Sequence, residues 1–158
     1  MLSSRLRRPA AFLFLTAAAL VPATARAQDV RVTIVTILAS DRPQESDPRL
    51  AEVKREVQKR EPNLTSYRFG NTGHRDISLG QKEAIKLFEA KDYFTDVKLL
   101  AKNDTQKRCT IEVKPPQFGA ITYETCYDKF MPILTRAVVD GERLIIAIMV
   151  KPAEKAKP

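Results

Sequence analysis

Two cysteines, Cys109 and Cys126, have the clearest capacity for chemistry in this chain. If the chain is exported, as its N-terminus indicates below, oxidising conditions favour a disulfide between them. The strand pattern argues against it. Matching the apolar faces of the two flanking strands sets Cys109 opposite Thr125, and a slip of one residue would mix those faces. The spacing is also unlike a Cys-x-x-Cys redox pair. A Cys109–Cys126 disulfide and two separate thiols both stay open.

His74 is the only histidine of the chain. A mononuclear zinc site would need further nitrogen or sulfur ligands, and the neighbouring residues supply none. One histidine would suffice for a Ser-His-Asp arrangement, but no nucleophile motif accompanies it. The stretch Gly73-His74-Arg75-Asp76 is typical of a turn. We therefore interpret His74 as an exposed turn residue.

Two loops contain residues that could bind ions. Residues 70–73 (Gly-Asn-Thr-Gly) could form an anion-binding nest, but the lysine and the helix of a phosphate loop are missing, so we predict a hairpin loop. Asp41, Glu45 and Asp47 crowd another loop without the spacing of an EF-hand. Capping of a helix and contact with water explain these three carboxylates.

Carboxylates far apart in the sequence could still pair in space and hydrolyse a substrate, and Glu112, Glu124 and Asp128 are the candidates. Asn63 and Asn103 each begin a glycosylation sequon, which we interpret as chance. The sequence thus assigns no catalytic, cofactor-binding or metal-ligating residue, and it calls for no cofactor.

The first 27 residues have the pattern of a cleavable signal peptide. Arg5, Arg7 and Arg8 form a basic start, and residues 10–21 are an uncharged apolar run that Pro22 ends. Small residues follow at 25–27 (Ala-Arg-Ala), where a signal peptidase cuts. The run is about a dozen residues, whereas a membrane span takes ~20. We predict export to the periplasm or the medium, a mature chain that begins at Gln28, and no stable membrane span after cleavage.

Removal of this segment changes the charge of the chain. The full sequence has 27 Lys and Arg against 19 Asp and Glu, a formal +8. The segment takes four arginines and no acid, so the mature chain has 23 against 19, or +4. Residues 151–158 hold another net +2. The folded part is nearly neutral, which argues against nucleic-acid binding.

The elements after the signal are mostly strands. Residues 30–38 and 144–150 are apolar runs, and such runs need cover on both faces, so both should lie at the centre of a sheet. Alternation predicts a strand that begins at about Thr65. Further short strands are expected at 75–79, 83–89, 95–102, 108–114, 120–126, 133–139 and 143–151. Asp140-Gly141 predicts a tight hairpin.

One helix is expected after the first strand. Asp47 is placed as its N-cap and Pro48 as its first residue. Leu50, Val53 and Val57 form its apolar stripe, and Glu61-Pro62 ends it. Residues 81–91 consist of good helix formers, but their neighbours are β, so we favour strand.

These elements predict an α+β fold: one N-terminal helix packed on a mostly antiparallel β-sheet, with a strand–helix–strand start and then a β meander. Residues 28–150 form a single domain, since 131 mature residues suit one core. Residues 151–158 form a disordered Lys/Pro/Ala tail.

Four stretches in this order resemble other proteins: the strand at 32–40, Asp-Pro-Arg-Leu at 47–50, Ser-Leu-Gly-Gln at 78–81, and Gly-Glu-Arg-Leu-Ile-Ile-Ala at 141–147. The layout resembles a loose group of uncharacterised exported bacterial proteins with no assigned activity. The resemblance implies a strand–helix–strand start and a β meander that ends in an apolar strand, and it transfers no functional residue.

Two functions follow from these observations. The first is an exported non-enzymatic domain of the bacterial envelope that binds a protein or a cell-wall polymer. The alternative is a small exported hydrolase or enzyme inhibitor with a site built from distant loops. A deep pocket with two carboxylates would favour the hydrolase, whereas a smooth surface with an exposed apolar patch would favour binding.

Overall fold

The computed structural model describes residues 30–153. The predicted signal peptide at 1–27 and residues 154–158 of the predicted tail lie outside this range. Within it, no helix is both long and apolar enough to cross a membrane.

Eight strands and one short helical segment make up the described chain. The order is β1 (Val30–Ser40), η1 (Pro48–Leu50), α1 (Ala51–Gln58), β2 (Ser66–Ile77), β3 (Lys82–Lys86), β4 (Phe94–Asn103), β5 (Arg108–Lys114), β6 (Ile121–Cys126), β7 (Met131–Val139) and β8 (Glu142–Pro152).

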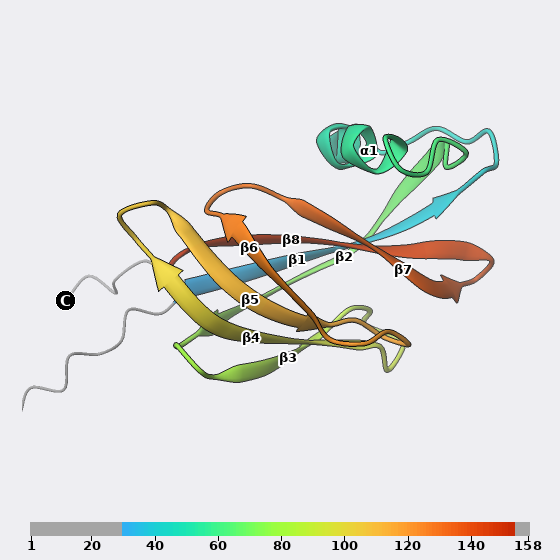
Figure 1. Ribbon diagram of the computed structural model, residues 1–158. Coiled ribbons are helices and arrows are strands. Elements are labelled where there is room, and N and C mark those ends of the chain that lie inside the picture. Colours follow the sequence, from blue (N-terminus) through green and yellow to red (C-terminus); the bar gives the residue numbers. More distant parts are fainter. Residues whose placement is uncertain (1–29, 154–158) are drawn as a thin grey trace, which may run out of the picture.

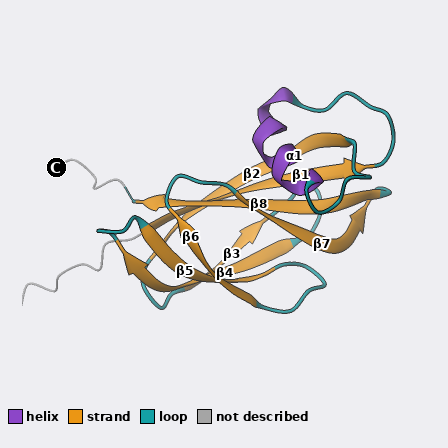
Figure 2. Cartoon of the chain, turned by 45° about the horizontal axis from the view of Figure 1, so that its top comes forward, coloured by secondary structure: helices purple, strands orange, loops and turns teal. Residues whose placement is uncertain are grey.

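The strands form two four-stranded antiparallel sheets, sheet A in the order β2-β1-β8-β7 and sheet B in the order β3-β4-β5-β6. The two sheets pack face to face, and α1 lies on the far side of sheet A (Figures 1 and 2). The α+β prediction is therefore wrong: the fold is a β-sandwich. Alternation of apolar and polar residues along a strand indicates that one face is buried, but it does not indicate which element covers that face. Here a second sheet covers it.

The centre of sheet A is as the two apolar runs predict. β1 pairs with β8 along almost its whole length, from Val30 opposite Pro152 to Ala39 opposite Arg143. The inward residues of β8 face sheet B, and the alternate residues Ile145 and Ala147 face α1. The strand thus has apolar cover on both faces, which explains its uninterrupted apolar sequence.

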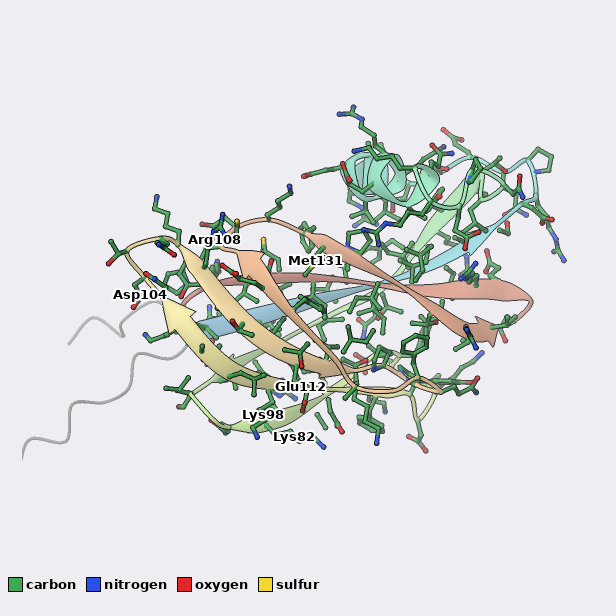
Figure 3. All side chains as sticks on the ribbon, viewed as in Figure 1. Lys82, Lys98, Asp104, Arg108, Glu112 and Met131 are labelled. Atoms are coloured by element: carbon green, nitrogen blue, oxygen red, sulfur yellow. The ribbon has the colours of Figure 1, made fainter. Side chains whose placement is uncertain are left out.

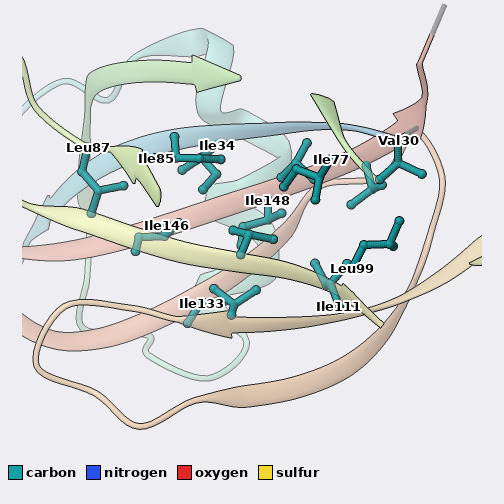
Figure 4. Close-up of a cluster of buried hydrophobic side chains, with 14 of the residues drawn as sticks. Val30, Ile34, Ile77, Ile85, Leu87, Leu99, Ile111, Ile133, Ile146 and Ile148 are labelled. Atoms are coloured by element: carbon teal, nitrogen blue, oxygen red, sulfur yellow. The ribbon is translucent and has the colours of Figure 1, made fainter. Parts of the chain in front are cut away.

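The main core lies between the sheets (Figure 4). Its members alternate along each strand with residues that point outward. Those labelled in the figure are Val30, Ile34, Ile77, Ile85, Leu87, Leu99, Ile111, Ile133, Ile146 and Ile148. Burial of these side chains gives the two sheets one shared hydrophobic core.

The helical segment begins as the sequence predicts. Asp47 accepts a hydrogen bond from the backbone N–H of Arg49 at 2.9 Å, and Pro48 follows as the first residue. The stripe of Leu50, Val53 and Val57 is buried against sheet A. The first turn is a 3-10 turn, and α1 ends at Gln58, before the predicted stop at Glu61. So short a helix covers only part of one sheet face.

The predicted hairpin loop at 70–73 is wrong. These residues lie inside β2, a single strand that spans both predicted strands around them. Gly73 is so close to β3 that an added Cβ would lie 2.8 Å from Cγ2 of Ile85. The glycines are there because two chain segments approach closely; a turn and a close approach look the same in sequence.

Three other strand predictions have clear outcomes. Asp140 and Gly141 both have positive φ, at 54° and 79°, and Val139 pairs with Glu142, so the tight hairpin is confirmed. Residues 82–86 form β3, as the preference for strand in 81–91 predicts, but the strand stops there. β8 continues to Pro152 because it still pairs with β1, so the predicted tail begins too early.

Candidate binding surface

The connections between strands gather at the two ends of the sandwich. β1 begins and β8 ends at one of them. The opposite end holds the connections at 41–47, 87–93, 115–120 and 140–141, and we call it the loop end (Figure 1). A 2.6 Å ion pair between Lys91 and Asp140 joins two of these connections. Loops held by a rigid scaffold are where binding residues concentrate.

An open depression of about 540 Å³ lies on the sheet B side of the loop end, and we call it the aromatic hollow. Its walls hold Phe94 at the start of β4 and Phe118 in the loop between β5 and β6. Phe94 is 46% exposed and Phe118 36% exposed. The other lining residues are Asp96, Lys114, Pro115, Pro116, Gln117 and Gly119. Large aromatic side chains left exposed to water in one depression are a mark of binding surfaces.

A tight turn presents Phe118. The backbone N–H of Phe118 donates to the carbonyl of Pro115 at 3.3 Å, which closes a four-residue turn. Pro116 fixes its own φ in that turn. Gln117 has a φ of 55°, in the left-handed region that usually selects glycine. The turn is thus stiff, and its strained residue comes directly before the exposed ring.

A second depression at the loop end is polar, and we call it the charged hollow. It measures about 260 Å³ and is lined by Ser40, Arg42, Gln44, Arg68, Asp140 and Glu142. Arg68 donates to the carboxylate of Glu142, and this bond raises the pKa of Arg68. Lys91 holds Asp140 with bonds of 2.6 and 2.7 Å. Both carboxylates of this hollow therefore already have cationic partners.

The helix side of the loop end carries a third depression of about 390 Å³, shaped by Asp47, Arg49 and Phe69. Arg49 binds the carboxylate of Asp47 and also stacks over the Phe69 ring, with 4.4 Å from Cζ to the ring centre. The side-chain bond from Arg49 lowers the pKa of Asp47, and the backbone N–H of Arg49 lowers it further. These contacts fix the start of the helix and occupy the charged groups of Asp47 and Arg49.

The two cysteines are free thiols on different faces of sheet B. Cys109 pairs with Thr125, as matching of the apolar faces predicts, and is buried in the core. Cys126 pairs with Arg108 and is exposed. Burial raises the pKa of Cys109 to about 11, so this thiol is a poor nucleophile at neutral pH. The pair has the register that disfavours a disulfide.

His74 lies in β2 and not in the predicted turn. It pairs with Thr33 of β1, on the outer face of sheet A beyond the helix, and it is exposed. It lines none of the depressions at the loop end. Among residues 30–153, no three His, Cys, Asp or Glu side chains gather where they could hold a metal ion.

The three carboxylates considered for hydrolysis do not meet at the loop end. Glu112 and Glu124 point outward from sheet B, and Glu124 forms a 3.1 Å ion pair with Arg108. Asp128 lies in a turn after β6 with a φ of 60° and is exposed. Of the three loop carboxylates explained by capping and contact with water, Asp41 and Glu45 are exposed and Asp47 caps the helix.

Sequence reasoning missed Phe94 and Phe118. Neither belongs to a motif, and only the position of Phe118 inside Pro-Pro-Gln-Phe-Gly, a loop in which an apolar ring has no core to enter, could have pointed to it. No local pattern indicates the two ion pairs at the charged hollow, because their partners are 49 and 74 residues apart in the chain.

No protein-family model, curated protein or solved structure matches this chain.

Proposed function

We propose that the protein is an exported, non-enzymatic domain of the bacterial envelope that binds a protein or a cell-wall polymer through its loop end. The observation that carries this proposal is the aromatic hollow, where two partly exposed phenylalanines line one open depression. Folding buries large aromatic side chains where it can, because each removes much apolar area from water. Rings kept in water suggest a partner that covers them.

The paired carboxylates of the charged hollow argue for binding over hydrolysis. A hydrolase with two carboxylates needs them aimed at one point in a sheltered pocket, with different pKa values. Asp140 and Glu142 come nearest to this arrangement, and each is occupied by a basic side chain. The hollow that they share is small and open to water. The alternative of a small exported hydrolase or inhibitor has no comparable feature in its favour.

The location outside the cytoplasm rests on the first 27 residues. Their basic start, apolar run and small residues before Gln28 are what a signal peptidase recognises. At the end opposite the loop end, β1 starts only two residues after Gln28. A mature chain cut there would carry its N-terminus away from the proposed binding surface.

Cross-linking in intact cells tests the proposal. Cells that produce the full chain with a C-terminal tag are treated with a cell-impermeant cross-linker, and the tagged protein is purified and analysed by mass spectrometry. We expect a reproducible envelope adduct and an N-terminal peptide that starts at Gln28. Recovery of the monomer alone, with neither a protein adduct nor a wall-polymer adduct, would contradict the binding function. Peptides from before residue 20 would contradict export with cleavage.

A further inference from the structure

We propose that the aromatic hollow binds an acidic polysaccharide, that is, a chain of sugar rings that bear carboxylates. This inference rests on the proposed binding function and names the class of its partner. It is carried by the two exposed phenylalanines, by the stiff turn beside them, and by the charges of the strands on either side.

The rings supply the first half of the match. The face of an aromatic ring is electronegative and attracts the polarised C–H groups that cover one side of a pyranose ring. Phe94 and Phe118 offer two such rings in one hollow. The turn at 115–118 holds Phe118 in place before a ligand arrives, so little conformational entropy is lost on binding.

The strands around Phe94 supply the second half of the match, which is positive charge. Lys86 of β3 lies directly opposite Phe94, and Lys114 of β5 lies opposite Asp96. Asp96 is already bound to Lys82 by a 2.7 Å ion pair. In the described part of the chain, neither Lys86 nor Lys114 has a carboxylate partner within 4 Å. Two ammonium groups without partners thus flank the rings, which favours an acidic ligand.

The row next to the hollow continues this pattern. Figure 3 shows Lys82, Lys98 and Glu112 near one another on sheet B, and the strand register places them side by side as a cross-strand row. Across the three rows, from Lys86–Phe94 to Lys82–Lys98–Glu112, four lysines stand against the acids Asp96 and Glu112, a net charge of +2. An extended acidic chain that leaves the hollow along sheet B would stay close to positive charge.

The size of the apolar patch favours a polysaccharide over a folded protein. A stable protein interface buries about 800 Å² on each partner. Two phenylalanines that are each less than half exposed supply only a small part of that area. Stacking of one or two sugar rings needs no more than the rings themselves, and the lysines then bind the acidic groups.

Affinity electrophoresis tests this inference, with protein that is expressed as the full chain and then purified. The gels contain polygalacturonate (acidic sugar chain), dextran (neutral sugar chain) or polyglutamate (acidic chain without sugars). We expect retardation by polygalacturonate and much less by the other two. The double variant Phe94→Ala/Phe118→Ala should lose at least tenfold in affinity. Lys86→Gln/Lys114→Gln should lose affinity and also most of its dependence on salt.

Two controls keep the result interpretable. Leu79→Ala removes another half-exposed apolar side chain, which is 52% exposed. Leu79 lies in the connection between β2 and β3, at the end of the sandwich opposite the loop end, so this variant should bind as the wild type does. Phe94→Tyr/Phe118→Tyr keeps both ring faces and should retain binding even if the alanine variant unfolds. Thermal melting of each variant shows whether it is folded.

Three outcomes would overturn the inference: equal retardation by polyglutamate, wild-type binding by the folded alanine variant, or no retardation by polygalacturonate. If one of these occurs while intact cells still yield an envelope adduct, the polysaccharide inference fails and the binding function stands. If cells yield no adduct either, both fail.

Discussion

Sheet A and sheet B each have four strands and share one core, but their outer faces differ in kind. In β8 of sheet A, neighbouring residues such as Ile145 and Ile146 are both fully buried, one under α1 and the other between the sheets. In β5 of sheet B, buried Ile111 is followed by half-buried Glu112 on the outer face. The contrast is visible in Figure 2, where the helix covers only sheet A. An apolar run therefore indicates two covers, and alternation indicates one.

Alanine substitutions at these neighbouring pairs test the contrast, and they have the largest expected effect. Ile145→Ala and Ile146→Ala should each lower the free energy of unfolding by about 2–5 kcal/mol, because both leave cavities in packed surroundings. The loss for Ile111→Ala should fall in the same range, whereas Glu112→Ala should change the free energy of unfolding by less than about 0.5 kcal/mol. Urea denaturation measures all four. A loss below about 0.5 kcal/mol for Ile145→Ala would mean that α1 does not pack on sheet A.

A glycine at the corner between the sheets gives the next effect. Gly73→Ala would put a Cβ 2.8 Å from Cγ2 of Ile85, so β2 or β3 must shift, and we expect a loss of about 1–3 kcal/mol. Gly119→Ala is the matched control, because nothing lies within 4 Å of its added Cβ, and it should be nearly neutral. The same urea titration compares them. Equal stabilities would show that the two strands are not in close contact.

The two faces of sheet B should also differ in their response to pH. Burial raises the pKa of Cys109 from 9.0 to about 11, so the folded state keeps its proton while the unfolded chain loses it. The stabilisation is thus complete below pH 9 and is lost as the pH rises towards about 11. Two pKa units correspond to a loss of about 3 kcal/mol.

Cysteine variants isolate this effect from other groups that titrate in alkali. Unfolding in urea between pH 8 and 11, with reductant present, should show a shallower decline for Cys109→Ala than for the wild type. Cys126→Ala removes the exposed thiol and should follow the wild-type slope. If all three proteins decline in parallel, Cys109 is not desolvated in the folded state.

The sequence by itself determined the local elements. Two apolar runs specified the central pair β1 and β8, Asp47 and Pro48 specified the start of the helix, Asp140-Gly141 specified a hairpin, and matching apolar faces specified Cys109 opposite Thr125. Each depends on residues close together in the chain or on a period that repeats along one strand. Propensity and patterning act over such distances.

Only the tertiary structure decided how these elements combine. Three features depend on which segments approach each other: the division into two sheets, the passage of β2 through Gly70 and Gly73, and the position of Phe94 and Phe118 in one depression. Burial of apolar surface is non-directional, so an apolar face can be covered by a helix or by another sheet. That choice depends on the shape of the whole chain, and the exposed rings of the aromatic hollow are one of its results.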